Sequence, residues 1–301
     1  MAPPLNELHF LFTTATPQAE QFRQHICQYN AALAFTSLGV EVDNSVNQGG
    51  GGPPTFRIHG ELCHRLGSLF PHRGDQPVYT QLYIYDPCEA LDCQMQRNAT
   101  LDPIIMECLQ GLILTNHHWA HIFKHAMEVF EDNGCEDVSI QLTTNNNCDQ
   151  RCWNLPTADE VAVIIPGDGT QSHGRRDIVL HCRDGPLCRI SNGSPMYECL
   201  QYPFLFICGE DGYHFDLQTS PSNESQLSPT DYTAYRIQHR LNEFSLLLRS
   251  NRLFQQYLVD MWAGAEQNRL NYIQFHQKDI RGSLYSGLTD AIAHDANLED
   301  I

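Results

Sequence analysis

Three histidines in one stretch of the chain have a spacing that could bind a metal ion. His117, His121 and His125 follow one another at four-residue intervals, so one face of a helix would carry all three. Two histidines for each metal leave a site short of ligands, and no glutamate occupies the H-E-x-x-H position. We therefore interpret them as a polar helix face or as packed imidazoles.

Four cysteines could form a thiolate zinc site only if two separate segments meet. Cys148 and Cys152 are four residues apart, and Cys182 and Cys188 flank an expected turn. Neither pair has the C-x2-C spacing of a zinc knuckle, so buried structural thiols are the favoured interpretation. We expect no bound metal and no cofactor.

The segment GEDGYH (209–214) combines two carboxylates with an imidazole. Glu210, Asp211 and His214 could bind a divalent ion. A surface turn fixed by the two glycines, with Tyr213 packed inward, explains the same residues without an ion. We favour the turn.

The motifs of nucleic-acid enzymes are missing from the sequence. Tyr232 and Tyr235 could act as paired nucleophiles, but no two histidines are separated by a single residue, so no metal-binding H-U-H triplet occurs. Phe precedes Lys124 and Gln precedes Lys278, which excludes a Gly-Lys-Ser/Thr phosphate loop. We expect one buried and one exposed tyrosine on a helix, and no enzymatic activity.

Basic side chains near the C-terminus have a distribution suited to phosphate contacts. The candidate nucleic-acid-binding residues are Arg236, Arg240, Arg249, Arg252, Arg269, Lys278 and Arg281. Interleaved amides could contact bases or sugars: Gln255, Gln256, Asn268, Asn271, Gln274 and Gln277. A solvated helix face with ion pairs such as Glu266–Arg269 is the open alternative.

The composition restricts these functions. The net charge of −18 argues against a broad basic surface, although the region from Asp231 to Asp290 has seven bases and six acids. The twelve cysteines are scattered, which is typical of a reduced, intracellular protein. We find neither a secretory signal nor an apolar run long enough to span a membrane.

A helix from Arg249 to Gly287 is the element that must position the basic residues. Leu253, Tyr257 and Met261 belong to a broad apolar stripe, which Leu270 and Ile273 extend. Such a stripe requires a partner surface in the rest of the chain.

The remaining chain predicts a mixed α+β body. Residues 5–33 and 101–133 have helical spacing, with Asp102 capping one helix and Asn116 the next. Strands are expected in two groups, which are 34–43, 55–66 and 78–86 as an antiparallel meander, and then 138–143, 160–166, 177–182 and 187–191. Asp184-Gly185 predicts a hairpin turn between the last two strands.

The polar stretch 219–229 predicts a linker between two units. Ser228 and Pro229 then supply an N-cap and a first helical residue. We expect an α+β fold of antiparallel strands with packed helices in residues 1–225. An all-helical C-terminal subdomain is expected in residues 226–301.

Several blocks of sequence resemble one family in the same order. They include FTSLGVEVD, PPTFRIHGELCHRLGSLFP, LQYPFLFICGEDGYH, NEFSLLLRSNRLFQQYLVDMWA and QNRLNYIQFHQKDIRGSLYSGL. From about Phe35 to Ala291 the chain is similar to the Helitron helicase-like N-terminal domain of eukaryotic rolling-circle transposases, especially fungal-type members.

The resemblance implies a non-catalytic N-terminal module, or a truncated copy, that assists DNA binding and positioning during transposition in the nucleus. Its implied partners are DNA, as a transposon end or single strand, and the nuclease and helicase domains of a transposase. An interaction scaffold that docks those domains, or an inactive transposon remnant, is the alternative.

Overall fold

The computed structural model describes residues 6–39, 41–43, 56–59, 62–71, 74–133, 138–142, 162–166, 178–181, 188–220, 223–241, 243–278 and 280. Within these residues, helices combine with antiparallel strands into an α+β fold whose C-terminal part is helical, as the sequence predicts. None of the helices in this part of the chain is long and apolar enough to cross a membrane.

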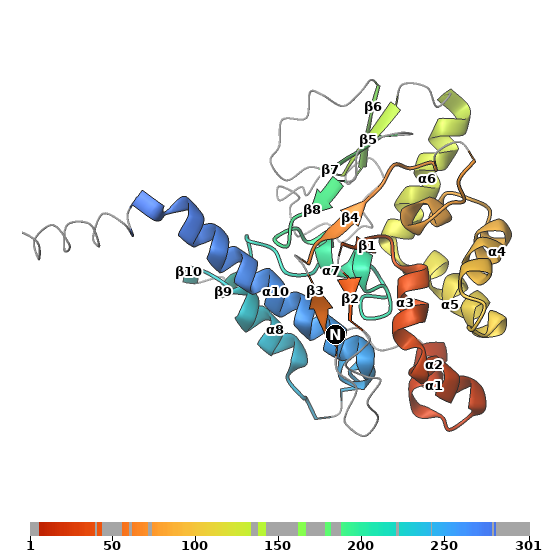
Figure 1. Ribbon diagram of the computed structural model, residues 1–301, viewed down its shortest axis with the longest axis horizontal. Helices are drawn as coiled ribbons and strands as arrows, with labels where there is room; N and C mark the ends of the chain where they lie inside the picture. Colours follow the sequence, from red (N-terminus) through yellow and green to blue (C-terminus); the bar gives the residue numbers. More distant parts are fainter. Residues whose placement is uncertain are drawn as a thin grey trace, which may run out of the picture.

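Helices from the first half of the chain gather along one side of the molecule (Figure 1). They are α1 (Asn6–Thr13), α2 (Pro17–Gln24), α3 (Ile26–Leu33), α4 (Pro87–Arg97), α5 (Pro103–Asn116) and α6 (His118–Asn133). Asp102 caps α5 as predicted, because its carboxylate accepts from the N–H groups of Ile104 and Ile105. Asn116 is instead the last residue of α5, where its amide donates to Leu112 O.

The strands form small antiparallel sheets. A three-stranded sheet has the order β1 (Ser37–Leu38), β4 (His64–Leu66), β8 (Cys188–Ile190), and another has the order β6 (Ala162–Pro166), β5 (Val138–Leu142), β7 (Ile178–His181). β2 (Glu41–Val42) pairs with β3 (Ile58–His59), and β9 (Gln218–Ser220) pairs with β10 (Asn223–Gln226). Since β7 and β8 belong to different sheets, the predicted pairing of these two strands is wrong; Asp184-Gly185 itself lies outside the described residues.

Other sequence predictions also fail. The expected strand at 78–86 contains a 3-10 helix, Tyr79–Tyr83, because Gln81 turns back to accept from Val78 N and donate to Ser68 O. The sequence did not predict α4 or α7 (Met196–Gln201). The stretch expected as a linker forms β9 and β10, and the division into two units at that point stays a prediction.

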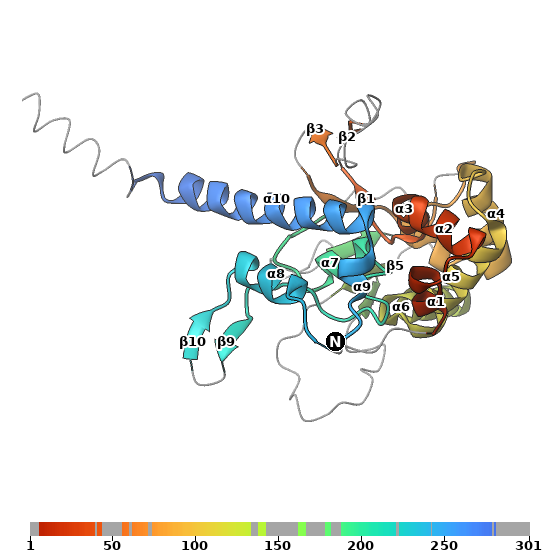
Figure 2. The ribbon, with the colours of Figure 1, turned by 90° about the horizontal axis from the view of Figure 1, so that it is seen from below.

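Three C-terminal helices end the described part of the chain: α8 (Pro229–Ile237), α9 (Leu246–Arg249) and α10 (Arg252–Phe275). Ser228 caps α8 as predicted, accepting from Asp231 N at 3.1 Å. The first half of α10 packs on the body, where Leu253 and Tyr257 are fully buried. Its second half leads away from the body in both views (Figures 1 and 2).

The apolar stripe of α10 is therefore buried over only part of its length. Trp262, Leu270 and Ile273 are 59%, 58% and 46% exposed. Among the described elements none covers them, so the expectation of one continuous packed stripe is wrong. Gln256, expected on the polar face, is buried beside Tyr202.

Candidate nucleic-acid interface

Two of the seven predicted basic residues are used inside the fold. The guanidinium of Arg236 lies 4.5 Å from the centre of the Phe206 ring, and its Nε atom is buried. Arg240 donates to Tyr235 O at 2.8 Å and lies 3.7 Å from Glu243. The guanidinium groups of both arginines are therefore engaged in contacts within the fold.

Arg269 fits the alternative interpretation, a solvated helix face with ion pairs. Its guanidinium donates to Glu266 one turn earlier, and it lies 5.7 Å from the centre of the Trp262 ring. An exposed ion pair of this kind contributes little to stability, but it neutralises the cation locally. Arg269 is therefore a weak candidate for a phosphate contact.

Three of the predicted residues remain accessible. Arg249 is exposed and packs its guanidinium 4.5 Å from the centre of the Phe244 ring. Arg252 and Lys278 are exposed and have no hydrogen bond or ion pair with another described residue. Arg281 lies outside the described residues.

Arg252 opens onto a cavity of about 780 Å³ between the end of α2 and the start of α10. We call it the junction cavity. It is lined by Glu20, Arg23, Gln24, His25, Leu248, Asn251, Arg252, Phe254 and Gln255.

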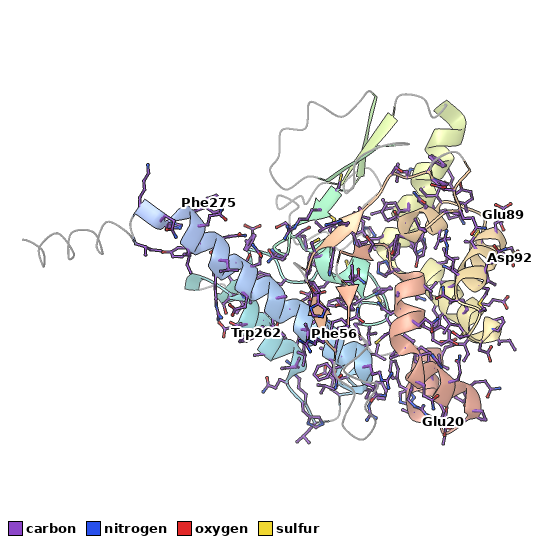
Figure 3. The ribbon with its side chains drawn as sticks, viewed as in Figure 1. Glu20, Phe56, Glu89, Asp92, Trp262 and Phe275 are labelled. Atoms are coloured by element: carbon purple, nitrogen blue, oxygen red, sulfur yellow. The ribbon has the colours of Figure 1, made fainter. Side chains whose placement is uncertain are left out.

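The junction cavity brings together several hydrogen-bond donors. Arg23 is held in place because its Nη1 donates to the carbonyls of Leu11 and Thr14, both at 2.8 Å. Asn251 precedes α10 with φ +48° and its side chain makes no capping hydrogen bond, so the partly positive start of this helix faces the cavity. In this first turn Leu253 N donates to Ser250 O at 2.9 Å. The acid Glu20, labelled in Figure 3, also lines the cavity, and its charge is opposite to that of the two arginines.

Sequence reasoning missed Arg23 and His25. Arg23 lies in α2 and His25 directly follows that helix, far from the basic C-terminal stretch in sequence, and only the packing of α10 near the N-terminal helices brings them to Arg252. The one available signal was an arginine and a histidine near the end of a predicted helix, which is too common to indicate a site.

A buried ionic cluster fixes α10 to the body. Asp260 accepts from His64 Nε2 at 2.7 Å, from the Tyr202 hydroxyl at 2.7 Å and from the Tyr197 hydroxyl at 2.8 Å. His64 Nδ1 lies 3.1 Å from the Tyr197 carbonyl oxygen, so the imidazole connects Asp260 on α10 with the backbone of α7. Both side chains are fully buried.

A second buried carboxylate lies nearby on α7. Glu198 accepts from Tyr213 N and from the Tyr257 hydroxyl, each at 2.6 Å. Burial raises the pKa of this carboxyl group, while the two hydrogen bonds and Arg236 oppose the increase. Glu198 and Asp260 together connect α7 with two successive turns of α10.

The histidines and cysteines that were weighed as metal ligands are not gathered into a site in the described structure. His117 is buried at the end of α5 and not on α6, where His121 and His125 lie exposed. No described group of three histidine, cysteine or acidic side chains is arranged to bind a metal. Cys148, Cys152 and Cys182 lie outside the described residues.

The segment GEDGYH (209–214) is irregular and is not assigned as a turn, but Tyr213 packs inward as expected. Gly209 has φ +71°, a conformation that favours glycine, and Tyr213 is buried. Tyr232 is half-buried and Tyr235 is 62% exposed, as expected for structural residues of α8.

His117 makes stability sensitive to acid. Burial lowers its pKa from 6.5 to about 3, while its Nε2 lies 3.3 Å from Cys199 O. The unfolded chain therefore binds a proton that the folded chain rejects, so stability is present above pH 6.5 and falls as the pH drops toward 3.

We expect His117 to cost about 2 kcal/mol of stability between pH 7 and pH 5. Urea unfolding of the wild type and of His117→Gln at both pH values measures this loss. Burial raises the pKa of Glu198 and Asp211 in both proteins, so the difference between their pH dependences isolates His117. Equal pH dependence in the two proteins would refute the assignment.

Residues 232–301 match the family model described as Helitron helicase-like domain at N-terminus. No curated protein matches the chain. The match covers most of α8, all of α9 and α10, and the predicted basic residues. The resemblance to the Helitron helicase-like N-terminal domain is thereby confirmed for the C-terminal part of the chain, residues 232–301.

Proposed function

We propose that the chain is a non-catalytic module of a Helitron-type rolling-circle transposase that binds and positions DNA in the nucleus. The observation that carries this proposal is the junction cavity, where Arg23, His25 and Arg252 converge at the start of α10. A phosphate group fits this combination of two arginines, an imidazole and the partly positive start of a helix. The match to a Helitron helicase-like domain supports DNA as the source of this phosphate.

The charge distribution explains how an acidic chain could bind DNA. At moderate salt, interactions between exposed charges are screened beyond about 10 Å. The net charge of −18 therefore does not cancel the attraction of a phosphate to a local cluster of cations. Arg252 is the strongest contact in this proposal because it is exposed and has no protein acid paired with it among the described residues. Arg249 extends the basic area from the adjoining helix.

Fluorescence anisotropy with a labelled single-stranded oligonucleotide tests the proposal. In about 50 mM salt we expect Arg252→Gln to weaken binding about five- to tenfold, the contribution of one phosphate contact. Arg269→Gln is the matched control, because its cation is already paired with Glu266, and should leave the affinity nearly unchanged. Absence of binding by the wild type would refute DNA positioning.

A second candidate function is a scaffold that docks the nuclease and helicase domains of a transposase. The specific observation is the exposed apolar surface of α10, where Trp262 and Leu270 are 59% and 58% exposed. An apolar cavity of about 500 Å³ between α8 and α10 adjoins Trp262. Trp262→Ser would weaken domain docking in this case and leave DNA affinity unchanged.

A further inference from the structure

One face of α10 carries side chains whose order reads the same from either end of the helix. Trp262, Glu266, Arg269 and Ile273 are spaced by four, three and four residues, which places them within about 60° around the helix axis. An apolar side chain lies at each end of this set, and an acid and a base lie between them. We call these four residues the symmetric face.

The symmetric face is open to solvent. Trp262 and Ile273 are 59% and 46% exposed, and Leu270 beside them is 58% exposed. The side chains of Arg269 and Glu266 are 57% and 45% exposed and pair with each other within the helix. The outer half of α10 carries this face away from the body in both views (Figures 1 and 2).

A second copy of α10, placed antiparallel to the first, complements this face. When the two helices cross midway between Gln267 and Asn268, Trp262 of each copy meets Ile273 of the other. The same alignment places Glu266 of each copy beside Arg269 of the other, because both pairs are symmetric about the same point. A parallel pair in register instead brings like charges together, so charge complementarity selects the antiparallel arrangement.

The acidity of the chain does not oppose this pairing. The symmetric face contains one acid and one base, so the contact is neutral in each copy although the chain carries a net charge of −18. Charges farther away than about 10 Å are screened at moderate salt. Across two copies the four charges alternate in sign and form a network, which contributes more than an isolated exposed pair.

An apolar cavity adjoins the contact in each copy. Its volume is about 500 Å³, and Ile237, Leu258, Met261 and Trp262 are among the residues that line it. Ile273 of the other copy lies beside this cavity in the antiparallel alignment, because it faces Trp262. The exposed apolar side chains and the stems of the charged ones bury roughly 1,000 Å² over the two copies, near the lower limit for a specific interface.

We propose that the symmetric face is the interface of a homodimer in which two α10 helices pack antiparallel. The inference goes beyond DNA positioning and does not depend on it. The two junction cavities lie at opposite ends of the helix pair, with the two copies of Arg252 separated by about 45 Å along the axis. The dimer therefore presents two separate copies of that cavity.

Sedimentation velocity of the full chain at about 1–100 µM tests the interface. We expect the wild type to dimerise in this range and Trp262→Ser to raise the dissociation constant at least about tenfold, because the change removes both symmetric Trp–Ile contacts. Phe275→Ser is the matched control. Phe275 is 78% exposed on the same helix (Figure 3) but lies about 140° from Trp262 around the axis, so this variant should dimerise like the wild type.

Two charge reversals distinguish this geometry from unspecific association. Glu266→Arg and Arg269→Glu each bring like charges together in a homodimer, so each variant should be monomeric at a concentration where the wild type is dimeric. An equimolar mixture of the two variants restores both opposite-charge pairs across the interface and should form a heterodimer. Far-UV circular dichroism verifies that the variants, all at exposed or half-exposed side chains, keep the wild-type fold.

Three outcomes overturn the inference. The first is a wild type that stays monomeric at about 100 µM, whether another segment of the chain or a domain of a transposase covers the face. The second is a dimer that persists unchanged in Trp262→Ser. The third is a mixture of the folded Glu266→Arg and Arg269→Glu variants that does not associate.

Discussion

Replacing Asp260 with alanine is expected to lower the free energy of unfolding by about 3–5 kcal/mol. The substitution removes the carboxylate that accepts from the His64 ring and from the hydroxyls of Tyr197 and Tyr202. All of these groups are buried, so water cannot replace the lost partner. Three buried polar groups without their acceptor account for the largest part of the expected loss.

Urea unfolding at pH 7 measures this effect. Glu266→Ala is the control, because it removes an exposed acid of the same helix whose partner is Arg269, and it should change stability by less than about 1 kcal/mol. If Asp260→Ala unfolds outright, His64→Phe together with Asp260→Leu removes both polar partners and should recover folding. A loss below about 1 kcal/mol for Asp260→Ala would contradict the ionic cluster.

Replacing Glu198 with alanine is expected to cost about 2–4 kcal/mol. The Tyr257 hydroxyl and the Tyr213 N–H would both lose their acceptor in a site closed to water. Arg236, whose Nε is already buried without a partner, would also lose its nearby carboxylate. These losses outweigh the free energy regained by no longer burying an acid.

Tyr257→Phe distinguishes this network from simple packing. It keeps the ring between α10 and the core but removes one hydrogen bond, so we expect a loss of about 1–2 kcal/mol. Thermal unfolding of both variants gives the comparison. Glu198→Ala with no greater loss than Tyr257→Phe would show that the carboxylate has no larger role than this one bond.

Local signals predicted a large part of the fold. Ser228 with Pro229 and Asp102 with Pro103 mark helix starts that depend only on neighbouring residues, and both caps form. The strand at 78–86 was wrong because alternating aromatic residues indicate half-buried positions without distinguishing a strand from a 3-10 turn. Only the tertiary contact of Gln81 with Ser68 decides between them.

The sites were less predictable because they depend on long-range packing. The basic stretch correctly included Arg252, but charge counting could not show that Arg236 is half-buried or that Arg269 is paired. The partner residue Arg23 lies in a segment whose sequence predicted a helix but no binding site. His64 and Asp260 are separated by most of the chain, so their buried pair could not be predicted.

α10 connects the stability of the fold with the proposed binding surface. Its first turn lines the junction cavity, and its third turn carries Asp260 into the core. The junction cavity therefore depends on the anchored helix. A change that releases Asp260 is expected to disturb the cavity.

The salt dependence of single-stranded DNA binding tests DNA positioning most directly. In a plot of log affinity against log salt concentration, each phosphate contact contributes about 0.7 to the slope. We predict that Arg252→Gln reduces the slope by about that amount and that Glu20→Gln, which removes the opposing acid of the junction cavity, strengthens binding. Identical slopes and affinities for the wild type and both variants would contradict the account.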